Sequence, residues 1–326
     1  MKLQTKQLKQ FKAVSSGIKS NGIIPILSYL KFEPGNITKS NLEAFVIMDA
    51  DVTDAMLIDE KVLMNFVDFT NADTITVTVK GNSIIITDGK AKVTSPTEDI
   101  KNFPAIAEAT NKPVNIEPEV IEAIKVASNF TIEDSTMPFK ECVFLGNGIV
   151  AASSGFICYT KAMEAPTAII HNNVAASLIK FHSLLYSETE TYQFFTNGIF
   201  KFGFVKNDTK FINMTPFSVI PEGEPTEVEK QELIKFCDIC ISNTPGRVVT
   251  ATINGNKMLM QDAAYGIDIE IPLSAKLDNF SFNPVIMAKM LKALPDEKLK
   301  FVRSTNKYFI TGDSGFVSLI MEIKAV

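Results

Sequence analysis

The sequence predicts an α+β fold built from three repeats of one unit. Three segments share one spacing of apolar residues, in which a strand residue is followed by a helical stripe. The copies begin 113 and 112 residues apart in a chain of 326 residues. A Thr or Glu suited to a helix start precedes each stripe. The shared positions are Leu3, Leu8, Phe11 and Val14, then Ile116, Ile121, Ile124 and Ala127, and finally Val228, Leu233, Phe236 and Ile239.

A second helix followed by a hairpin recurs in each third of the chain. The apolar spacing predicts these helices over 60–69, 174–185 and 284–294. Asn82, Asn197 and Asn306 lie between strand-like runs and are expected at matching hairpin turns. The organisation is therefore three domains of two helices packed on β-sheet, at residues 1–111, 112–223 and 224–326.

Composition excludes several classes of protein. Hydrophobic residues make up 46% of the chain, which is too many for a disordered protein. No apolar run is long enough to span a bilayer, and the N-terminus alternates lysine with glutamine, so a soluble cytoplasmic protein without a membrane partner is expected. Cys237 and Cys240 lie three apart in a predicted helix without a second ligand pair. We expect them to be buried core residues, although such a pair can also be redox-active or half of a zinc site.

The charges are unevenly distributed along the chain. The formal net charge is −5, from 32 basic and 37 acidic residues, which by itself argues against nucleic acid. However, six lysines and no acidic residue precede Glu33. A protein that is acidic overall but basic at a few places attracts a polyanion only at those places.

Patterns typical of enzymes are missing from the sequence. The chain has two histidines, His171 and His182, and it has no zinc-protease motif, P-loop or dinucleotide-binding glycine motif. Asp49 and Asp51 are the nearest approach to a carboxylate pair, but a strand places such residues on one face routinely. The sequence therefore predicts a protein without catalytic activity, cofactor or metal.

Several segments resemble the bacterial DNA polymerase sliding clamps, the beta subunits of DNA polymerase III. The segment GIIPILSYLKF resembles the first-domain motif of that family, and NFPAI resembles the end of its first domain. FNPVIMAKMLKAL and the terminal GFVSLIMEIKAV resemble motifs of its third domain. The chain is somewhat short for the family, which is consistent with a phage or mobile-element version.

The resemblance implies a head-to-tail homodimeric ring of DNA-clamp fold around double-stranded DNA. Such a ring needs positive potential in its hole and no base-specific contacts. Acid-free helical segments supply lysines, although a lysine-bearing face can also be merely solvated. Only two arginines, Arg247 and Arg303, are present, so sequence-specific readout is not expected. The candidate DNA-binding residues are Lys6, Lys9, Lys12, Lys19, Lys180, Lys289 and Lys292.

The resemblance also implies an apolar pocket for short peptide motifs of the DNA polymerase and the clamp loader. The matching residues are Phe139, Gly155, Phe156, Ile157, Cys158, Pro216, Val219, Met321 and Ile323. Any of them could instead be an ordinary strand residue facing a core. Phe156, Ile157 and Glu322 depart from the residues usual in the family, so a more apolar pocket is expected.

The ring joints implied by the resemblance fall on two segments expected to be sheet edges. They are represented by Phe103 and Ile106 in the first domain and by Ile267 and Ile269 in the third. Pairing of exposed edges would remove a liability to aggregation, although the same subunit could also cover them. Two alternatives to a replicative clamp remain: a ring-shaped platform for transcription or repair factors, and a three-repeat scaffold that does not bind DNA.

Overall fold

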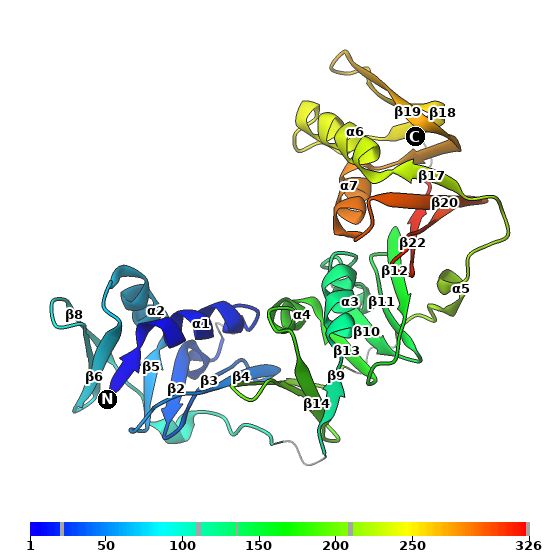
Figure 1. Cartoon of the computed structure of the whole chain (residues 1–326). Helices are drawn as coiled ribbons and strands as arrows, with labels where there is room; N and C mark the ends of the chain where they lie inside the picture. Colours follow the sequence, from blue (N-terminus) through cyan, green and yellow to red (C-terminus); the bar gives the residue numbers. More distant parts are fainter. Residues whose placement is uncertain (20–22, 109–111, 135, 208–210, 324–326) are drawn as a thin grey trace. The chain divides into compact units, whose positions relative to one another are not determined.

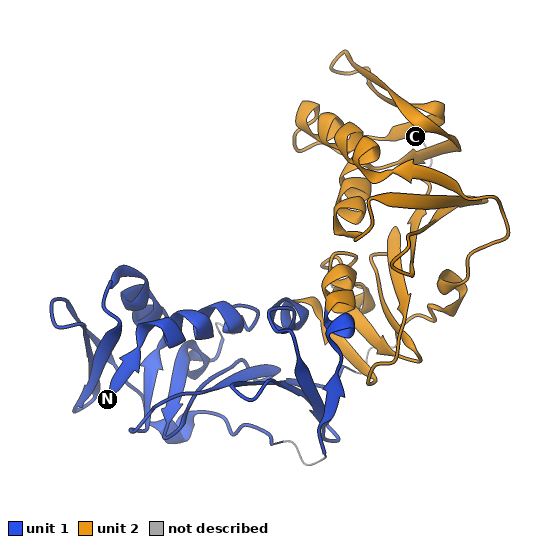
Figure 2. Ribbon diagram, in the orientation of Figure 1, with its two compact units in different colours: residues 1–121, 173–207 blue, residues 122–172, 208–326 orange. Residues whose placement is uncertain are grey.

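A computed structural model describes residues 1–19, 23–108, 112–134, 136–207 and 211–323 (Figure 1). The chain divides into two compact units, which are residues 1–121 with 173–207 and residues 122–172 with 208–326 (Figure 2). The fold is α+β with antiparallel sheets, as predicted. Residue 111, the predicted end of the first domain, lies outside the described residues.

Unit 1 contains a four-stranded sheet, β1-β6-β7-β8, and an eight-stranded sheet, β5-β2-β3-β4-β16-β15-β14-β9. Helices α1 and α2 pack against each other, as Figure 1 shows. The helices are α1 (Thr5–Ser15), α2 (Glu60–Phe69) and α4 (Asn172–Leu178), with 3₁₀ turns at Pro25–Ser28 and Ile100–Asn102. The strands are β1 (Lys2–Gln4), β2 (Tyr29–Glu33), β3 (Asn36–Ser40), β4 (Ala44–Asp49), β5 (Met56–Asp59), β6 (Thr74–Lys80), β7 (Ser83–Thr87), β8 (Lys92–Pro96), β9 (Val114–Ile116), β14 (Leu184–Glu188), β15 (Tyr192–Thr196) and β16 (Phe200–Val205).

Unit 2 contains an eight-stranded sheet, β13-β10-β11-β12-β22-β21-β20-β17, and the long hairpin β18-β19. Helix α3 (Pro118–Ser128) begins in unit 1 and continues into unit 2. The other helices are α5 (Thr215–Ser218), α6 (Lys230–Asn243) and α7 (Pro284–Ala293), with a 3₁₀ turn at Pro138–Glu141. The strands are β10 (Cys142–Gly146), β11 (Ile149–Ser153), β12 (Ile157–Ala162), β13 (Ala168–His171), β17 (Thr226–Glu229), β18 (Ala251–Asp262), β19 (Ile267–Phe282), β20 (Lys298–Ser304), β21 (Lys307–Thr311) and β22 (Phe316–Met321).

The repeated strand-then-helix prediction is confirmed in all three copies. Helices α1, α3 and α6 each follow a short strand, namely β1, β9 and β17. Their predicted stripes are buried with one exception, because Ile239 is only half-buried while Cys240 is fully buried. The last buried position of the third stripe is therefore Cys240 and not Ile239. All four cysteines are buried, and burial raises the pKa of the Cys240 thiol to about 11 and that of Cys158 to about 12.

The second helix of each third is confirmed at α2 and α7 but is shorter than predicted at α4. This helix ends at Leu178, and β14 already begins at Leu184. The predicted helix over 174–185 is thus wrong in its second half, where residues 179–183 form no helix and Leu184 and Leu185 begin a strand. Asn197 is also misplaced, because it joins β15 to β16, one hairpin later than Asn82 and Asn306.

Both eight-stranded sheets join strands from two of the three predicted domains. Strand β4 pairs with β16 in unit 1, and β12 pairs with β22 in unit 2. Strand order makes β8, β16 and β22 equivalent, since each ends the hairpin pair that follows a second helix. In the described residues β8 pairs only with β7, so its outer edge is open. The first half of β19 pairs only with β18 and is open in the same way.

The described residues contain no helix that combines the length and apolar character needed to cross a bilayer.

Candidate functional site

The predicted DNA-binding lysines fall into two groups. Lys6, Lys9 and Lys19 have exposed side chains, and no ion pair of theirs is found among the described residues. Lys12 instead pairs with Asp68 of the neighbouring helix α2. Lys292 of α7 is bonded in the same way to Asp238 of α6, at 2.7 Å. A phosphate would have to compete with these carboxylates.

Two further lysines of the predicted set hold the backbone in place. The ammonium of Lys180 donates to the carbonyl of Ala13, near the end of α1, and to Oγ of Ser16 at 3.3 Å. Lys289 donates to the carbonyl of Thr131 at 2.9 Å. Partial burial lowers the pKa of both ammonium groups. Within the predicted set, the lysines without such a contact are therefore Lys6 and Lys9 on α1 and Lys19 shortly after it.

The repeat shows how local this positive charge is. Lys6 and Lys9 of α1 match Glu119 and Glu122 of α3, because the two stripes have the same spacing. All four side chains are exposed. The same exposed helix positions thus carry lysines in the first copy of the repeat and glutamates in the second.

An apolar cluster lies on one face of the sheet where β12 meets β22. Its buried members include Cys158, Leu319 and Phe309 on three strands and Met214 just before α5. Helix α5 packs on both β12 and β22. The predicted pocket residue Met321 packs against this cluster, as do Phe144, Phe211 and Phe217.

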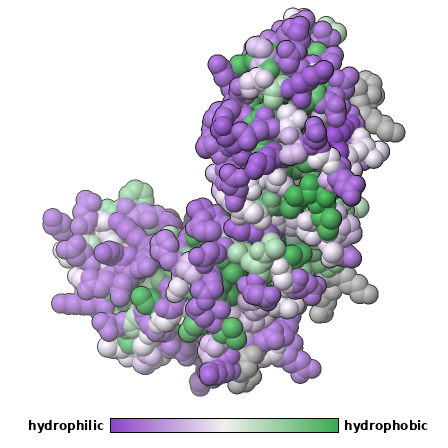
Figure 3. Space-filling view, turned by 45° about the vertical axis from the view of Figure 1, so that its right-hand side comes forward, coloured by the Kyte–Doolittle hydropathy of each residue, from purple (hydrophilic) through white to green (hydrophobic). Residues whose placement is uncertain are grey.

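Other predicted pocket residues come from segments next to the elements that form the cluster. The Phe156 side chain is 50% exposed, and its carbonyl accepts the Met321 N–H at 2.8 Å. Val219 is 63% exposed directly after α5, and Pro216 and Gly155 are also exposed. Phe139 packs edge-on against Phe211, with the two ring centroids 6.4 Å apart. Figure 3 shows hydrophobic residues gathered in limited areas of a mainly hydrophilic surface.

One predicted pocket residue, Ile157, points away from this face. Ile157 lies opposite Ile320, whereas its neighbour Cys158 lies opposite Leu319. Because side chains alternate along a strand, buried Ile157 points to the other face of the sheet. Ile323 follows the end of β22, and its N–H donates to the Ser281 carbonyl of β19 at 2.9 Å.

The sequence reasoning missed the part of the cluster that comes from α5 and from the segment before it. Phe211, Met214 and Phe217 lie in a stretch without regular periodicity, where apolar residues are unexpected in a solvated loop. That concentration of apolar residues was the available signal.

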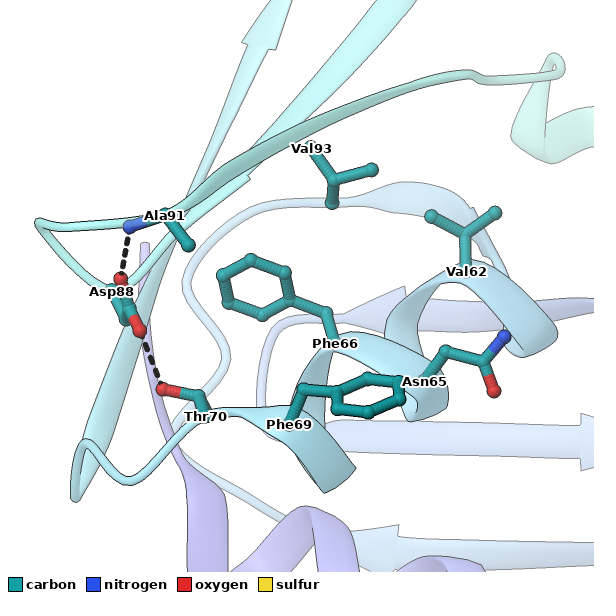
Figure 4. Close-up of a pocket in the computed structure, with 8 residues that line it drawn as sticks. All are labelled: Val62, Asn65, Phe66, Phe69, Thr70, Asp88, Ala91 and Val93. Carbon is teal, nitrogen blue, oxygen red and sulfur yellow. Dashed lines mark hydrogen bonds between the residues drawn. The ribbon is translucent and has the colours of Figure 1, made fainter.

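The open edge of β8 lies beside a second apolar pocket, of about 370 Å³ (Figure 4). Val62, Phe66 and Phe69 of α2 line it together with Ala91 and Val93. Phe69 is 87% exposed. These α2 residues form a second apolar stripe beside the buried one of Leu63, Met64 and Val67, and an apolar surface on two sides of a helix predicts two covered faces. This stripe was missed in the sequence.

Asp88 fixes one wall of this pocket. Its carboxylate accepts from Oγ1 of Thr70 and from the N–H of Ala91, both at 2.7 Å (Figure 4). It also accepts from the N–H of Lys90 at 2.9 Å. The Thr70 bond first, and then the backbone bonds, lower the pKa of Asp88 to about 2. The carboxylate therefore ties the end of α2 to the turn that leads into β8.

The predicted joint residues are placed differently from one another. Ile267 and Ile269 are half-buried on the open half of β19, with Ile269 opposite Met260. Ile106 is half-buried in the segment after the Ile100–Asn102 turn. Phe103 is only 6% exposed within unit 1, where the Lys31 ammonium lies 5.9 Å from its ring. The expectation that Phe103 is exposed at an edge is wrong, and β8 supplies the open edge instead.

No cluster of three or more His, Cys, Asp or Glu residues suited to a metal ion is found in the part of the chain that the structure describes.

Comparison with known proteins gives matches in structure only. Neither a family model nor a curated protein matches the sequence. The DNA polymerase III beta subunit from Thermotoga maritima has a TM-score of 0.83 and 17% identity, with 100% of this chain and 99% of that chain covered. The DNA polymerase sliding clamp from Bacillus subtilis has a TM-score of 0.82 and 17% identity at the same coverage.

A third solved structure is similar to the same extent. The DNA polymerase III beta-subunit sliding clamp from Pseudomonas aeruginosa bound to griselimycin has a TM-score of 0.83 and 15% identity, covering 100% of this chain and 99% of that one. The full-length similarity shows that this chain has the three-domain sliding-clamp fold, and it confirms the fold class predicted from the sequence.

Proposed function

We propose that this chain is a DNA sliding clamp, a non-enzymatic ring of two copies that encircles duplex DNA and tethers a polymerase. One observation carries the proposal. The same kind of strand pairing occurs at two places in the chain, and one strand of each kind is left with an open edge. Strands β16 and β22 pair with β4 and β12, while β8 and the first half of β19 have no partner on one side among the residues that the structure describes. Each copy can therefore give one edge and accept one, which is head-to-tail assembly.

The side chains at the two edges suit such a joint. Val93 lies opposite the buried Ile86, so it faces the covered side of its sheet. Ile269 lies opposite buried Met260 and faces the covered side of the β18-β19 hairpin. Pairing β8 of one copy with β19 of another would bring these faces together and close the pocket at Phe69. The proposed domains are 1–111, 112–223 and 224–326, with the polymerase peptide bound beside α5.

The assembly proposal is tested by sedimentation. Ile269→Asp and Val93→Asp should each convert a dimer to a monomer at micromolar concentration, because the joint would bury an unpaired carboxylate. Val79→Asp is the control, since Val79 is 48% exposed in the same sheet as β8 but away from its edge. A wild-type chain that sediments as a monomer would count decisively against the ring.

The DNA proposal is tested by retention on circular duplex DNA in the presence of a clamp loader. Lys6→Glu with Lys9→Glu should reduce retention equally on all sequences and make the salt dependence shallower by about one unit per lost phosphate contact. Lys80→Glu with Lys276→Glu gives the same charge change at two exposed strand residues and should have little effect. Equal loss from both pairs would show a general charge effect and no DNA-facing helix.

A further inference from the structure

The cation Lys307 lies at the rim of the apolar cluster beside α5. It begins β21 and lies opposite Met321 on β22. Its ammonium is 5.3 Å from the ring centroid of Phe309 and 5.4 Å from that of Phe217. Both aromatic contacts attract a cation and restrict where the flexible side chain can go. The charge is therefore held beside the surface at which we propose that a peptide binds.

Lys307 has no ion pair among the described residues, whereas the charges around it are paired. Glu322, next to Met321, accepts from Arg303 at 2.8 Å. Asp134 accepts from Lys140 at 2.8 Å on the Phe139 side of the cluster. Glu141 lies 2.8 Å from Nε2 of His171. The rim of the cluster thus carries one half-buried positive charge that no carboxylate of the described chain neutralises.

A ligand that covers the cluster also covers the Lys307 ammonium and removes water from it. An entirely apolar peptide would remove water from Lys307 and leave the charge without a partner, which costs free energy. A carboxylate beside the apolar anchor would instead form a charge-assisted hydrogen bond. The aromatic rings position the ammonium without using up its hydrogen-bonding capacity, since it has three N–H donors.

We propose that Lys307 selects partner peptides in which an Asp or Glu side chain adjoins the apolar anchor. This specificity rests on the proposed peptide-binding function of the surface beside α5. The equivalent position in the other eight-stranded sheet is Tyr192, which begins β15 as Lys307 begins β21. A cation at this position therefore occurs in only one of the two sheets and does not follow from the repeated fold.

The test begins with random short peptides displayed on phage and selected on the full-length wild-type chain. Clones that bind the pocket are those whose binding is lost in Met321→Ala. Among these clones, Asp or Glu should neighbour a Leu, Phe or Met more often than in the unselected library. The best clone is then synthesised with a C-terminal amide, which removes the terminal carboxylate, and in a matched form with its acid changed to the amide.

Calorimetry on the two synthetic peptides isolates the role of Lys307. The acidic peptide should bind wild type about five- to tenfold more tightly than its amide twin, a range expected for a partly exposed charged hydrogen bond. Lys307→Gln should abolish that difference, and Lys307→Glu should reverse it. Lys276→Gln removes an exposed lysine of β19, outside the eight-stranded sheet, and should leave the difference unchanged.

The outcomes separate the two levels of the proposal. Clones that depend on Met321 but show no acidic preference, or twin peptides of equal affinity, would overturn the role of Lys307 and leave the peptide surface intact. A selection that yields no Met321-dependent clone would overturn both. A preference for acid that persists in Lys307→Gln would assign the effect to another cation.

Discussion

The two sheet junctions, β4 with β16 and β12 with β22, have the same backbone arrangement, but different side chains fill them. Phe45 lies opposite Gly203 in the first junction, and Cys158 lies opposite Leu319 in the second. Phe45 is 3% exposed and also packs edge-on against Phe194, at 6.1 Å between ring centroids. A Cβ on Gly203 would lie 2.2 Å from Cζ of Phe45. The first junction is filled by its own strand.

The second junction has a small residue where the first has a large one. Its cluster around Cys158 is completed by Met214 and by Phe217 from the α5 region. Val219, directly after α5, is exposed, as is Phe156, directly before β12. The large residue of the pair therefore stands on β4 in the first junction and on β22 in the second, where the α5 region packs over it. A binding surface can then arise at one copy of a repeated frame without a change of backbone.

Charges at the two junctions differ in sign at equivalent positions. Glu188 of β14 pairs with Lys206, just after β16, at 2.9 Å. Arg303 of β20 pairs with Glu322, just after β22, at 2.8 Å. Both pairs connect the ends of equivalent strands. Both junctions therefore have an ion pair at this place, but the acidic and basic residues are exchanged. Tyr192 and Lys307 stand next to these pairs at equivalent positions, and of these two residues only Lys307 carries a charge.

The largest effect is expected from Gly203→Leu, which puts the residue found at the second junction, Leu319, into the first. The side chain would collide with the Phe45 ring, and the overpacking should cost about 3 kcal/mol of unfolding free energy or more. Urea unfolding at fixed protein concentration measures the change. Adding Phe45→Cys should recover much of the loss, because the pair Cys and Leu is the one found at β12 and β22. Equal stability of the two variants would show that the ring and the glycine are not coupled.

The next largest effect distinguishes the two junctions by whether they bind a peptide. Met321→Ala should weaken a peptide selected on the wild-type chain by about 1–3 kcal/mol, the range for truncating a buried apolar anchor. Val205→Ala is the matched change at the end of β16 and should leave affinity unaltered, since the first junction is closed by Phe45. Calorimetry gives both values. Loss of affinity in Val205→Ala would place the peptide elsewhere.

Sequence reasoning recovered the repeat because its signal is periodic. The stripes at Leu8 and Phe11, and their counterparts in α3 and α6, depend only on which helix face is buried. It failed at Ile239 and at the end of α4, where a neighbouring cysteine and a following strand offer competing apolar patterns. Helix and strand are hard to separate over short apolar runs such as residues 179–185.

The candidate site was less predictable for a different reason. Ile157 and Cys158 are neighbours in sequence, and only the register of β12 on β22 shows which of them faces the cluster. The open edge fell at β8 and not at Phe103, because edges are a property of strand order. The ion pairs that occupy Lys12 and Lys292 likewise join helices distant in sequence. Such relations depend on long-range packing, which spacing along the chain does not encode.

The smallest expected effect concerns pH and the reversed ion pairs. Hydrogen bonds from Lys206 and then from Tyr186 lower the pKa of Glu188 below its ordinary 4.5. A carboxyl whose pKa is lowered in the folded state contributes stability above its ordinary pKa and loses it as the pH falls through the folded value. Because the side chain is 39% exposed and screened by solvent, the contribution should be only a few tenths of a kcal/mol, about the size of a surface pair. Glu188→Gln should therefore be slightly less stable than wild type at pH 7, and the two urea midpoints should converge as the pH is lowered below 4.5. A difference that is constant with pH would assign the loss to the Tyr186 hydrogen bond and not to the charge.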